Sequence, residues 1–282
     1  MSARIVVTVA LLTLQEAARR RVLRALAALT VVLLALSAWG FSRIDAEFGG
    51  LTSGESRMVA AMVLNLVMFG LSLIAALGTA FLAGPTLAGE VESGIALAVL
   101  ARPVRRAAVL VGKWLGLVIF GGSYVAIAGL AQLLVVKATL GYWPPQPVTG
   151  LALLAAQATA LLTLGLLLST AISPMASGIV AVGLFCATWV AGVVGGVGGA
   201  LGNAGVQRVG TVSQMLLPTD GLWRGAMRAF QDPTLFAQLG EGFEGHPFLS
   251  ESPLTITYLG WAALWTALVL ALAALAFQRR DL

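Results

Sequence analysis

The sequence contains few charged residues and very few residues of the kinds that bind metals. Charged residues make up 10% of the 282 positions, whereas soluble domains carry about 25%. Cys186 is the only cysteine and His246 the only histidine, which excludes an intrachain disulfide and gives no indication of a metal site. Hydrophobic residues make up 59% of the chain, and the mean hydropathy is +0.95. The composition therefore predicts an integral membrane protein.

Acidic residues are scarcer than basic ones. The chain has 17 Lys and Arg against 12 Asp and Glu, which gives a formal net charge of +5. Membrane proteins concentrate basic residues in their cytoplasmic segments, and this accounts for such an excess. We therefore predict a lipid bilayer as a partner of the chain, and no nucleic acid.

Nucleotide-binding and catalytic motifs are absent. No Lys of a phosphate-binding loop follows the glycine-rich stretch at 192–205, so we interpret this stretch as a loosened helix end. The sequence has no G-x-S-x-G and no H-E-x-x-H motif. We predict neither an enzymatic activity nor a cofactor bound by this chain. Any ATP hydrolysis must come from another polypeptide.

Long apolar runs predict an all-α integral membrane protein with six transmembrane helices. A helix needs about 20 residues to cross a bilayer. The predicted spans lie at about 25–41, 58–82, 114–136, 149–168, 178–194 and 256–277. They contain no Asp, Glu, Lys, Arg or His, so proton coupling within the bilayer is poorly supported.

The apolar run within the first 24 residues is too short to form a further span. Residues 5–14 are apolar, and Arg19, Arg20, Arg21 and Arg24 follow them. We predict an N-terminal interfacial helix over 1–24, with its apolar side in the lipid and its arginines at the phosphate level. The alternative is a frayed tail.

A polar segment at 84–113 separates the second and third predicted spans. It reads GPTLAGEVESGIALAVLARPVRRAAVLVGK. Val91, Ile95 and Val99 are spaced four apart, as on one face of a helix. The residue before a proline avoids helical angles, so the helix ends near 102–103. The pattern predicts a short helix at the membrane surface, with acids at its start and basic residues after its end.

This segment resembles the loop between the second and third spans of type-2 ABC exporter permeases. The matching residues are Glu90, Glu92-Ser93-Gly94, Arg102-Pro103, Arg105 and Gly112-Lys113. The last residues, 278–282, are similar to the ending of the branch that includes the permease of nitrous oxide reductase maturation.

The resemblance implies one transmembrane permease domain over 1–282 and several partners. These are a second permease, in a homodimer or heterodimer, and a pair of ABC ATPase subunits that hold ATP and Mg. The segment at 84–113 would be the cytoplasmic coupling loop. The residues expected to couple to the ATPase are Glu90, Glu92, Gly94, Arg102 and Arg105. The second and fifth spans would line the substrate path, where Asn65 is a candidate; helix packing is the alternative role for Asn65.

Six spans place both termini on the same side of the membrane. Eleven of the 17 basic residues lie on the side of the termini: Arg4, Arg19, Arg20, Arg21, Arg24, Arg102, Arg105, Arg106, Lys113, Arg279 and Arg280. Basic residues favour the cytoplasmic side. We therefore predict a multi-pass protein of the bacterial cytoplasmic (inner) membrane with both termini in the cytoplasm.

Residues 203–253 then form an extracytoplasmic segment before the last span. Thr219 and Asp220 are residue types that cap the start of a helix. Trp223, Met227 and Phe230 follow at steps that place them on one helix face. We predict short helices that pack on the outer mouth of the spans and cap the cavity. The alternative is a plain surface loop.

The predicted function is that of the membrane-spanning subunit of an ATP-driven exporter. The alternative is a non-transporting membrane protein that serves in assembly or sensing. A lipid, a peptide, a drug or a factor for metalloenzyme maturation would all be compatible with the sequence as the substrate.

Overall fold

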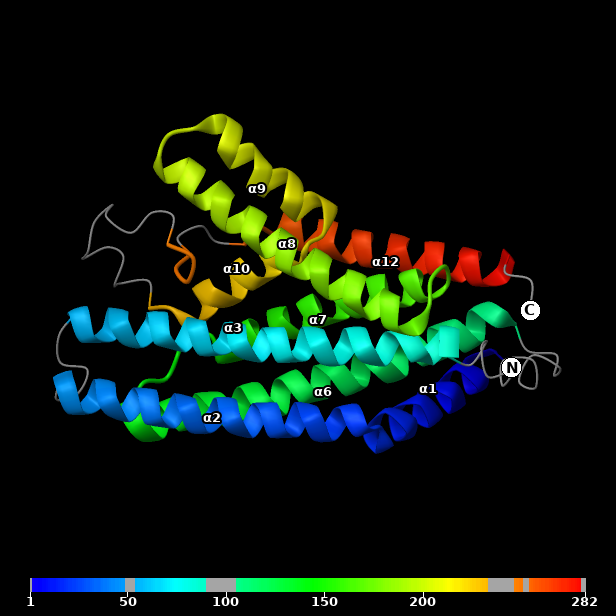
Figure 1. The fold of residues 1–282 in the computed structure, drawn as a ribbon, viewed down its shortest axis with the longest axis horizontal. Coiled ribbons are helices and arrows are strands. Elements are labelled where there is room, and N and C mark those ends of the chain that lie inside the picture. Colours follow the sequence, from blue (N-terminus) through cyan, green and yellow to red (C-terminus); the bar gives the residue numbers. More distant parts are fainter. Residues whose placement is uncertain (1, 49–53, 90–104, 233–245, 251–253, 280–282) are drawn as a thin grey trace.

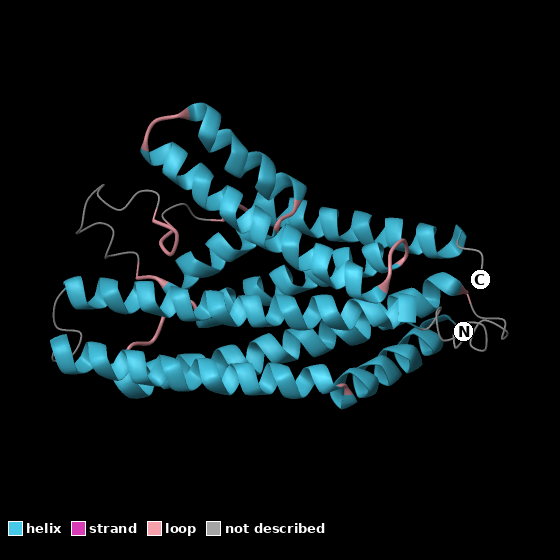
Figure 2. Cartoon of the chain, in the orientation of Figure 1, coloured by secondary structure: helices cyan, strands magenta, loops and turns pink. Residues whose placement is uncertain are grey.

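The computed structural model describes residues 2–48, 54–89, 105–232, 246–250 and 254–279. Within these ranges every regular element is a helix and none is a strand (Figure 2). The predicted all-α class is therefore confirmed.

Six helices of the described part are long and apolar enough to cross a membrane. They are α2 (Arg21–Phe48), α3 (Gly54–Gly84), α6 (Arg106–Leu140), α7 (Pro147–Ser169), α8 (Pro174–Ala200) and α12 (Ile256–Arg279). The predicted six apolar helices are present, and most extend beyond the uncharged runs. Helical hydrogen bonding continues through charged turns that the apolar runs do not include. The first turns of α6, including Lys113, are accordingly helical and not part of a loop.

The N-terminal segment forms its own helix, α1 (Ser2–Arg19), and α2 begins directly after Arg20. α1 packs closely on α6. A Cβ at Gly112 would lie 2.7 Å from Val9 Cβ, and one at Gly116 would lie 2.5 Å from the carbonyl oxygen of Ala10. The other side of α1 exposes Val7, Leu11 and Leu12. One face of α1 is thus used for packing, and another apolar face remains available to lipid.

The predicted helix end lies within the glycine-rich stretch, which is helical up to Ala200, turns at 201–203 and is helical again from Ala204. α8 continues to Ala200, and α9 (Ala204–Leu216) returns beside it. A Cβ at Gly195 would lie 2.6 Å from the Cα of Gly210. The glycines therefore allow two backbones to pack against each other, as small residues do in membrane helices. Composition alone did not reveal the packing partner.

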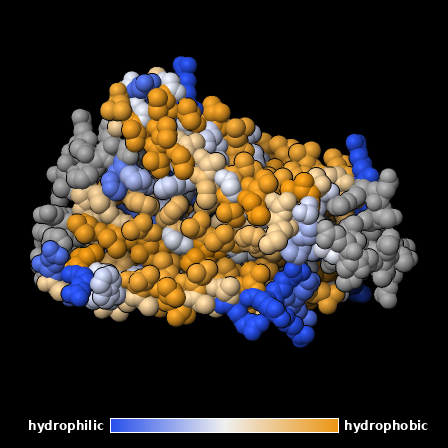
Figure 3. Space-filling view, viewed as in Figure 1, coloured by the Kyte–Doolittle hydropathy of each residue, from blue (hydrophilic) through white to orange (hydrophobic). Residues whose placement is uncertain are grey.

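Figure 1 shows the helices as an elongated bundle. α2, α3 and α6 pack together along one side, and α8 and α9 lean away from it. The start of α6 and the described ends of α1 and α12 lie at one end, which we name the terminal end. The turn between α8 and α9 lies at the other, which we name the outer end. Hydrophobic residues cover much of the surface between the two ends (Figure 3).

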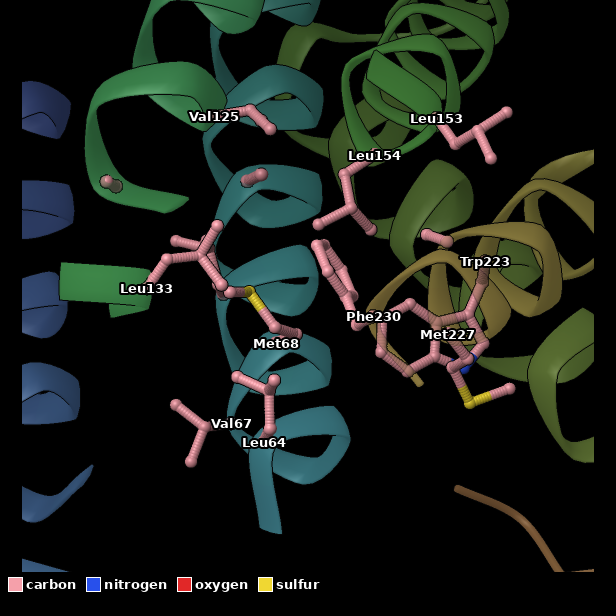
Figure 4. Packing of buried hydrophobic residues seen from close by; sticks show 14 of the residues in the cluster. Leu64, Val67, Met68, Val125, Leu133, Leu153, Leu154, Trp223, Met227 and Phe230 are labelled. Carbon is pink, nitrogen blue, oxygen red and sulfur yellow. The ribbon is translucent and has the colours of Figure 1, made fainter. Parts of the chain in front are cut away.

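The largest hydrophobic cluster joins α3, α6, α7 and the short helix α10 (Thr219–Phe230). Met68 of α3, Leu154 of α7 and Phe230 of α10 converge there (Figure 4). Met68 and Phe230 are fully buried, and Leu154 is almost so. The short helix α10 is thus enclosed by the long helices.

Candidate functional site

A helix forms at Thr219–Phe230, and it is enclosed by the bundle instead of resting on its mouth. α9 runs from the outer end toward the middle of the bundle, and α10 runs back (Figure 1). We name α9 and α10 the re-entrant pair. Trp223, Met227 and Phe230 are each at most 1% exposed. Phe230 fits against Gly150 near the start of α7, where a Cβ would lie only 2.3 Å from its ring.

Aromatic rings connect α10 to its neighbours. The Trp223 ring lies 5.4 Å from the ring of Phe69 in α3, and Phe69 stacks on Trp189 of α8 at 4.6 Å. Phe248 lies 5.9 Å from Phe69. Such pairs add specific geometry to apolar burial. The indole nitrogen of Trp223 has no hydrogen-bond partner in the part of the chain that the structure describes.

Buried polar side chains connect three spans to the tip of the re-entrant pair. Ser72 of α3 donates to Gln157 Oε1 of α7 at 2.7 Å, and Gln157 Nε2 donates to the carbonyl oxygen of Thr219 at 3.1 Å. The hydroxyls of Thr219 and Thr188 of α8 lie 3.1 Å apart. We name these four residues the polar ladder. Because its groups are buried, each hydrogen bond also avoids the cost of an unpaired polar atom.

The polar ladder lies deep in the bundle. Gln157 follows the first residue of α7, Pro147, by ten positions, which corresponds to ~15 Å along a helix. This is half of the ~30 Å hydrocarbon thickness of a bilayer. The tip of the re-entrant pair therefore lies about half a bilayer thickness along α7 from the start of that helix.

An ion pair occurs at the same tip. Asp220 is 2% exposed, and its Oδ2 accepts hydrogen bonds from Gln214 Nε2 and Arg224 Nε, both at 2.9 Å. Asp220 and Arg224 both lie outside the six predicted spans, so the uncharged spans gave no indication of a buried ion pair. Gly192 of α8 leaves room for the carboxylate, because a Cβ there would lie 2.1 Å from Oδ2. The hydroxyl of Tyr258 donates to the carbonyl oxygen of Gln214 at 3.1 Å and closes the site from α12.

Asn65, predicted to lie on the substrate path, is fully buried in this conformation. Its Nδ2 donates to the carbonyl oxygen of Phe248 at 2.8 Å. Its Oδ1 has no partner within the described ranges. Asn65 thus connects the second span to the segment at 246–250, and in this conformation it touches no solvent.

At the terminal end, the two chain segments that flank 90–104 are joined. α3 passes into a π-helical turn at Pro85–Gly89, and α6 begins at Arg106. Lys113 Nζ donates to the carbonyl oxygen of Thr86 at 2.6 Å, and Lys113 is 5% exposed. Arg105 is exposed in an extended conformation directly before α6. The other predicted coupling residues, Glu90, Glu92, Gly94 and Arg102, lie outside the described residues.

The comparison with protein families agrees with this architecture. The model of the ABC-2 family transporter protein matches residues 9–282. The chain belongs to the ABC-2 transporter family. It is therefore a multi-pass permease of an ABC transporter and not itself an enzyme, and the family implies an ABC ATPase partner and dimerisation. No curated protein matches the chain in sequence.

For an ABC-2 permease, the polar ladder and the Asp220–Arg224 pair are the residues that sequence reasoning missed. Gln157 offered a signal, because it is the only amide side chain in the predicted span at 149–168. Its partners are 85 and 62 positions away in the sequence. Within the described ranges of this permease, no group of three or more Asp, Glu, His or Cys could hold a metal.

Proposed function

We propose that the chain is the membrane-spanning subunit of an ATP-driven exporter in the bacterial inner membrane, with both termini in the cytoplasm. The family match over residues 9–282 carries this proposal. Two such permeases, identical or not, would form the path, and two ABC ATPase subunits would hold ATP and Mg. The ending at 278–282 favours the branch related to nitrous oxide reductase maturation.

In this proposal, the segment at 90–104 carries the contact with the ATPase. Glu90, Glu92, Gly94 and Arg102 belong to it, and Arg105 follows it directly. The hydrogen bond from Lys113 to Thr86 would make the ends of α3 and α6 move together.

The end of α3 also touches α8. A Cβ at Gly84 would lie 2.3 Å from the carbonyl oxygen of Pro174, the first residue of α8. A displacement of the coupling segment would therefore reach the second and fifth spans through direct contacts.

The re-entrant pair is then the element that opens and closes the outer part of the path. α3 holds Gln157 through Ser72, and Gln157 holds the tip at Thr219. Trp223, Met227 and Phe230 fill the space between α3, α7 and α8. Movement of α3 would change this packing and with it the access to the outer side.

The test is co-purification followed by activity in proteoliposomes. We expect the isolated chain not to hydrolyse ATP, and we expect an ABC ATPase to co-purify with it. Arg105→Glu should weaken this association, whereas Arg208→Glu, at an exposed position of α9 near the outer end, should not. A membrane protein of assembly or sensing would instead co-purify without an ATPase, and that result would refute the exporter.

A further inference from the structure

Two neighbouring cavities lie between α7, α10 and α12. The larger is an apolar groove of about 470 Å³, on the side of α7 that faces α12. Its lining includes Leu222, Leu259, Ala263, Thr266 and Trp114. The smaller is a pocket of about 270 Å³ toward the outer end, lined by Gln146, Thr149 and Arg228 among others. Sites for small molecules typically measure about 300–1,000 Å³.

The two cavities adjoin at Leu259, which lines both. Together they form one elongated site, in which the groove is mostly apolar and the pocket adds the polar side chains of Gln146, Thr149, Arg228 and Gln231. The groove follows α12 from Leu259 to Leu270. This interval corresponds to ~16 Å of helix. One leaflet contributes about 15 Å of hydrocarbon, half of the ~30 Å core. The groove thus has the length of the acyl chain of a lipid in one leaflet.

The smaller pocket carries side chains that can hold an anion. Arg228 is the basic residue in its lining, and its guanidinium has five N–H donors, so it can bind a phosphate in addition to its existing partners. Gln146 and Thr149 are exposed at the start of α7. The N-terminal end of a helix carries partial positive charge and favours anions. The described lining contains no acidic residue.

We propose that this site binds one anionic phospholipid from the leaflet at the outer end. The phosphate head group lies in the pocket beside Arg228, and one acyl chain lies in the groove and extends toward Trp114. Trp114 of α6 lines the groove, and its orientation is fixed by a hydrogen bond from its Nε1 to Thr163 Oγ1 at 2.8 Å. Because Leu222 of α10 lines the groove, the lipid contacts the re-entrant pair directly.

The charge part of the proposal is tested by native mass spectrometry of the purified chain with phosphatidylglycerol and with phosphatidylcholine of the same acyl chains. We expect one bound phosphatidylglycerol and clearly weaker binding of phosphatidylcholine. Loss of a hydrogen-bonded charge should reduce the affinity of Arg228→Gln for phosphatidylglycerol by roughly tenfold. Arg208→Gln, on α9, is the matched control and should bind as the parent does. Equal binding of the two lipids, or no effect of Arg228→Gln, would overturn the assignment.

The groove is tested independently by filling it. Ala267 is exposed and lines the groove, whereas Leu268 is exposed and does not. Ala267→Phe should reduce binding of both lipids, and Leu268→Phe should leave binding unchanged. Thermal unfolding of both variants shows whether the fold is retained. A folded Ala267→Phe variant that binds phosphatidylglycerol as the parent does would refute the acyl-chain site. If a second copy of the chain occupied this groove, the protein would form a dimer that Ala267→Phe dissociates. That result would also refute the lipid site.

Discussion

Lys113 Nζ in the first turns of α6 donates a hydrogen bond at 2.6 Å to the carbonyl oxygen of Thr86, which lies directly after α3. Lys113 is 5% exposed, and a buried ammonium is stable only where its charge is hydrogen-bonded. Thr86 lies in the π-helical turn at Pro85–Gly89. The contact therefore joins the turn after one span to the first turns of the next.

We expect Lys113→Met to uncouple the two spans. Methionine retains an unbranched apolar stem and removes the ammonium group. The Thr86 carbonyl then loses a donor, which costs about 1–3 kcal/mol when the group stays buried. We expect ATPase binding to persist, while transport per ATP hydrolysed falls. Reconstituted transport and ATPase rates measure this ratio.

Lys137→Met is the control for this prediction. Lys137 lies near the other end of the same helix, is exposed and lies over the ring of Trp143. It should leave the ratio of transport to hydrolysis unchanged. If the ratio of transport to ATP hydrolysis is the same in Lys113→Met and Lys137→Met, the hydrogen bond from Lys113 to Thr86 has no coupling role.

Gln157→Leu should destabilise the polar ladder. The substitution keeps a similar volume and leaves the Ser72 hydroxyl and the Thr219 carbonyl without this partner. Hydrogen bonds between membrane helices contribute about 0.6–2 kcal/mol each. We expect a loss in this range in the free energy of unfolding, measured by denaturation in mixed micelles.

A double-mutant cycle with Ser72→Ala isolates the contribution of the contact. Since Ser72 and Gln157 share a hydrogen bond, their effects should not add, and the double variant should lose less than the sum of the two single losses. Strictly additive losses would show that the two side chains do not interact in the membrane.

Six spans could be predicted from sequence because lipid imposes a length and an apolar composition on every membrane helix. The helix that carries Trp223 could also be predicted from its apolar face, but its predicted cap was wrong: Pro218 is the cap residue, and Thr219 and Asp220 lie within the first turn. The enclosed position of this helix could not be predicted from the sequence. It depends on contacts such as that of Thr219 with Gln157, which lie 62 positions apart. The close packing of Gly195 on Gly210 could not be predicted for the same reason, because the sequence does not show which backbone approaches a glycine.

Trp223 can be tested with two substitutions of different size. Trp223→Ala removes a large buried side chain, a change that costs about 3–5 kcal/mol in a packed core. Trp223→Phe keeps most of the apolar volume and removes an indole N–H that has no partner among the described residues. We expect Trp223→Phe to remain folded and to export, and Trp223→Ala to lose export. Because Trp223 is distant from the terminal end, the folded fraction of both variants should still bind the ATPase. Loss of ATPase binding by folded Trp223→Ala would contradict this separation.

Gly195→Val should separate α8 from α9. A Cβ at Gly195 would lie 2.6 Å from the Cα of Gly210. Backbone atoms cannot move aside as the end of a flexible side chain can, so the two helices would have to separate. Overpacking of this kind costs about 1–3 kcal/mol. Gly183→Val is the matched control in the same helix, because no atom lies within 4 Å of a Cβ there. Thermal unfolding should show a lower midpoint for Gly195→Val than for Gly183→Val; equal midpoints would rule out the close packing of α8 on α9.

The orientation of the chain in the membrane can be tested by labelling single cysteines. Cys186 is exposed on α8, so Cys186→Ser provides the background for this experiment. Ala3 lies near the start of α1 at the terminal end, and Ala204 lies at the turn between α8 and α9 at the outer end; both are exposed. The excess of basic residues on the side of the termini favours the cytoplasm for that side. We therefore expect an impermeant maleimide to label Ala204→Cys in intact cells and Ala3→Cys only after the membrane is opened. Labelling of both positions in intact cells would contradict the six-span arrangement, and the reverse pattern would invert the orientation and with it the direction of export.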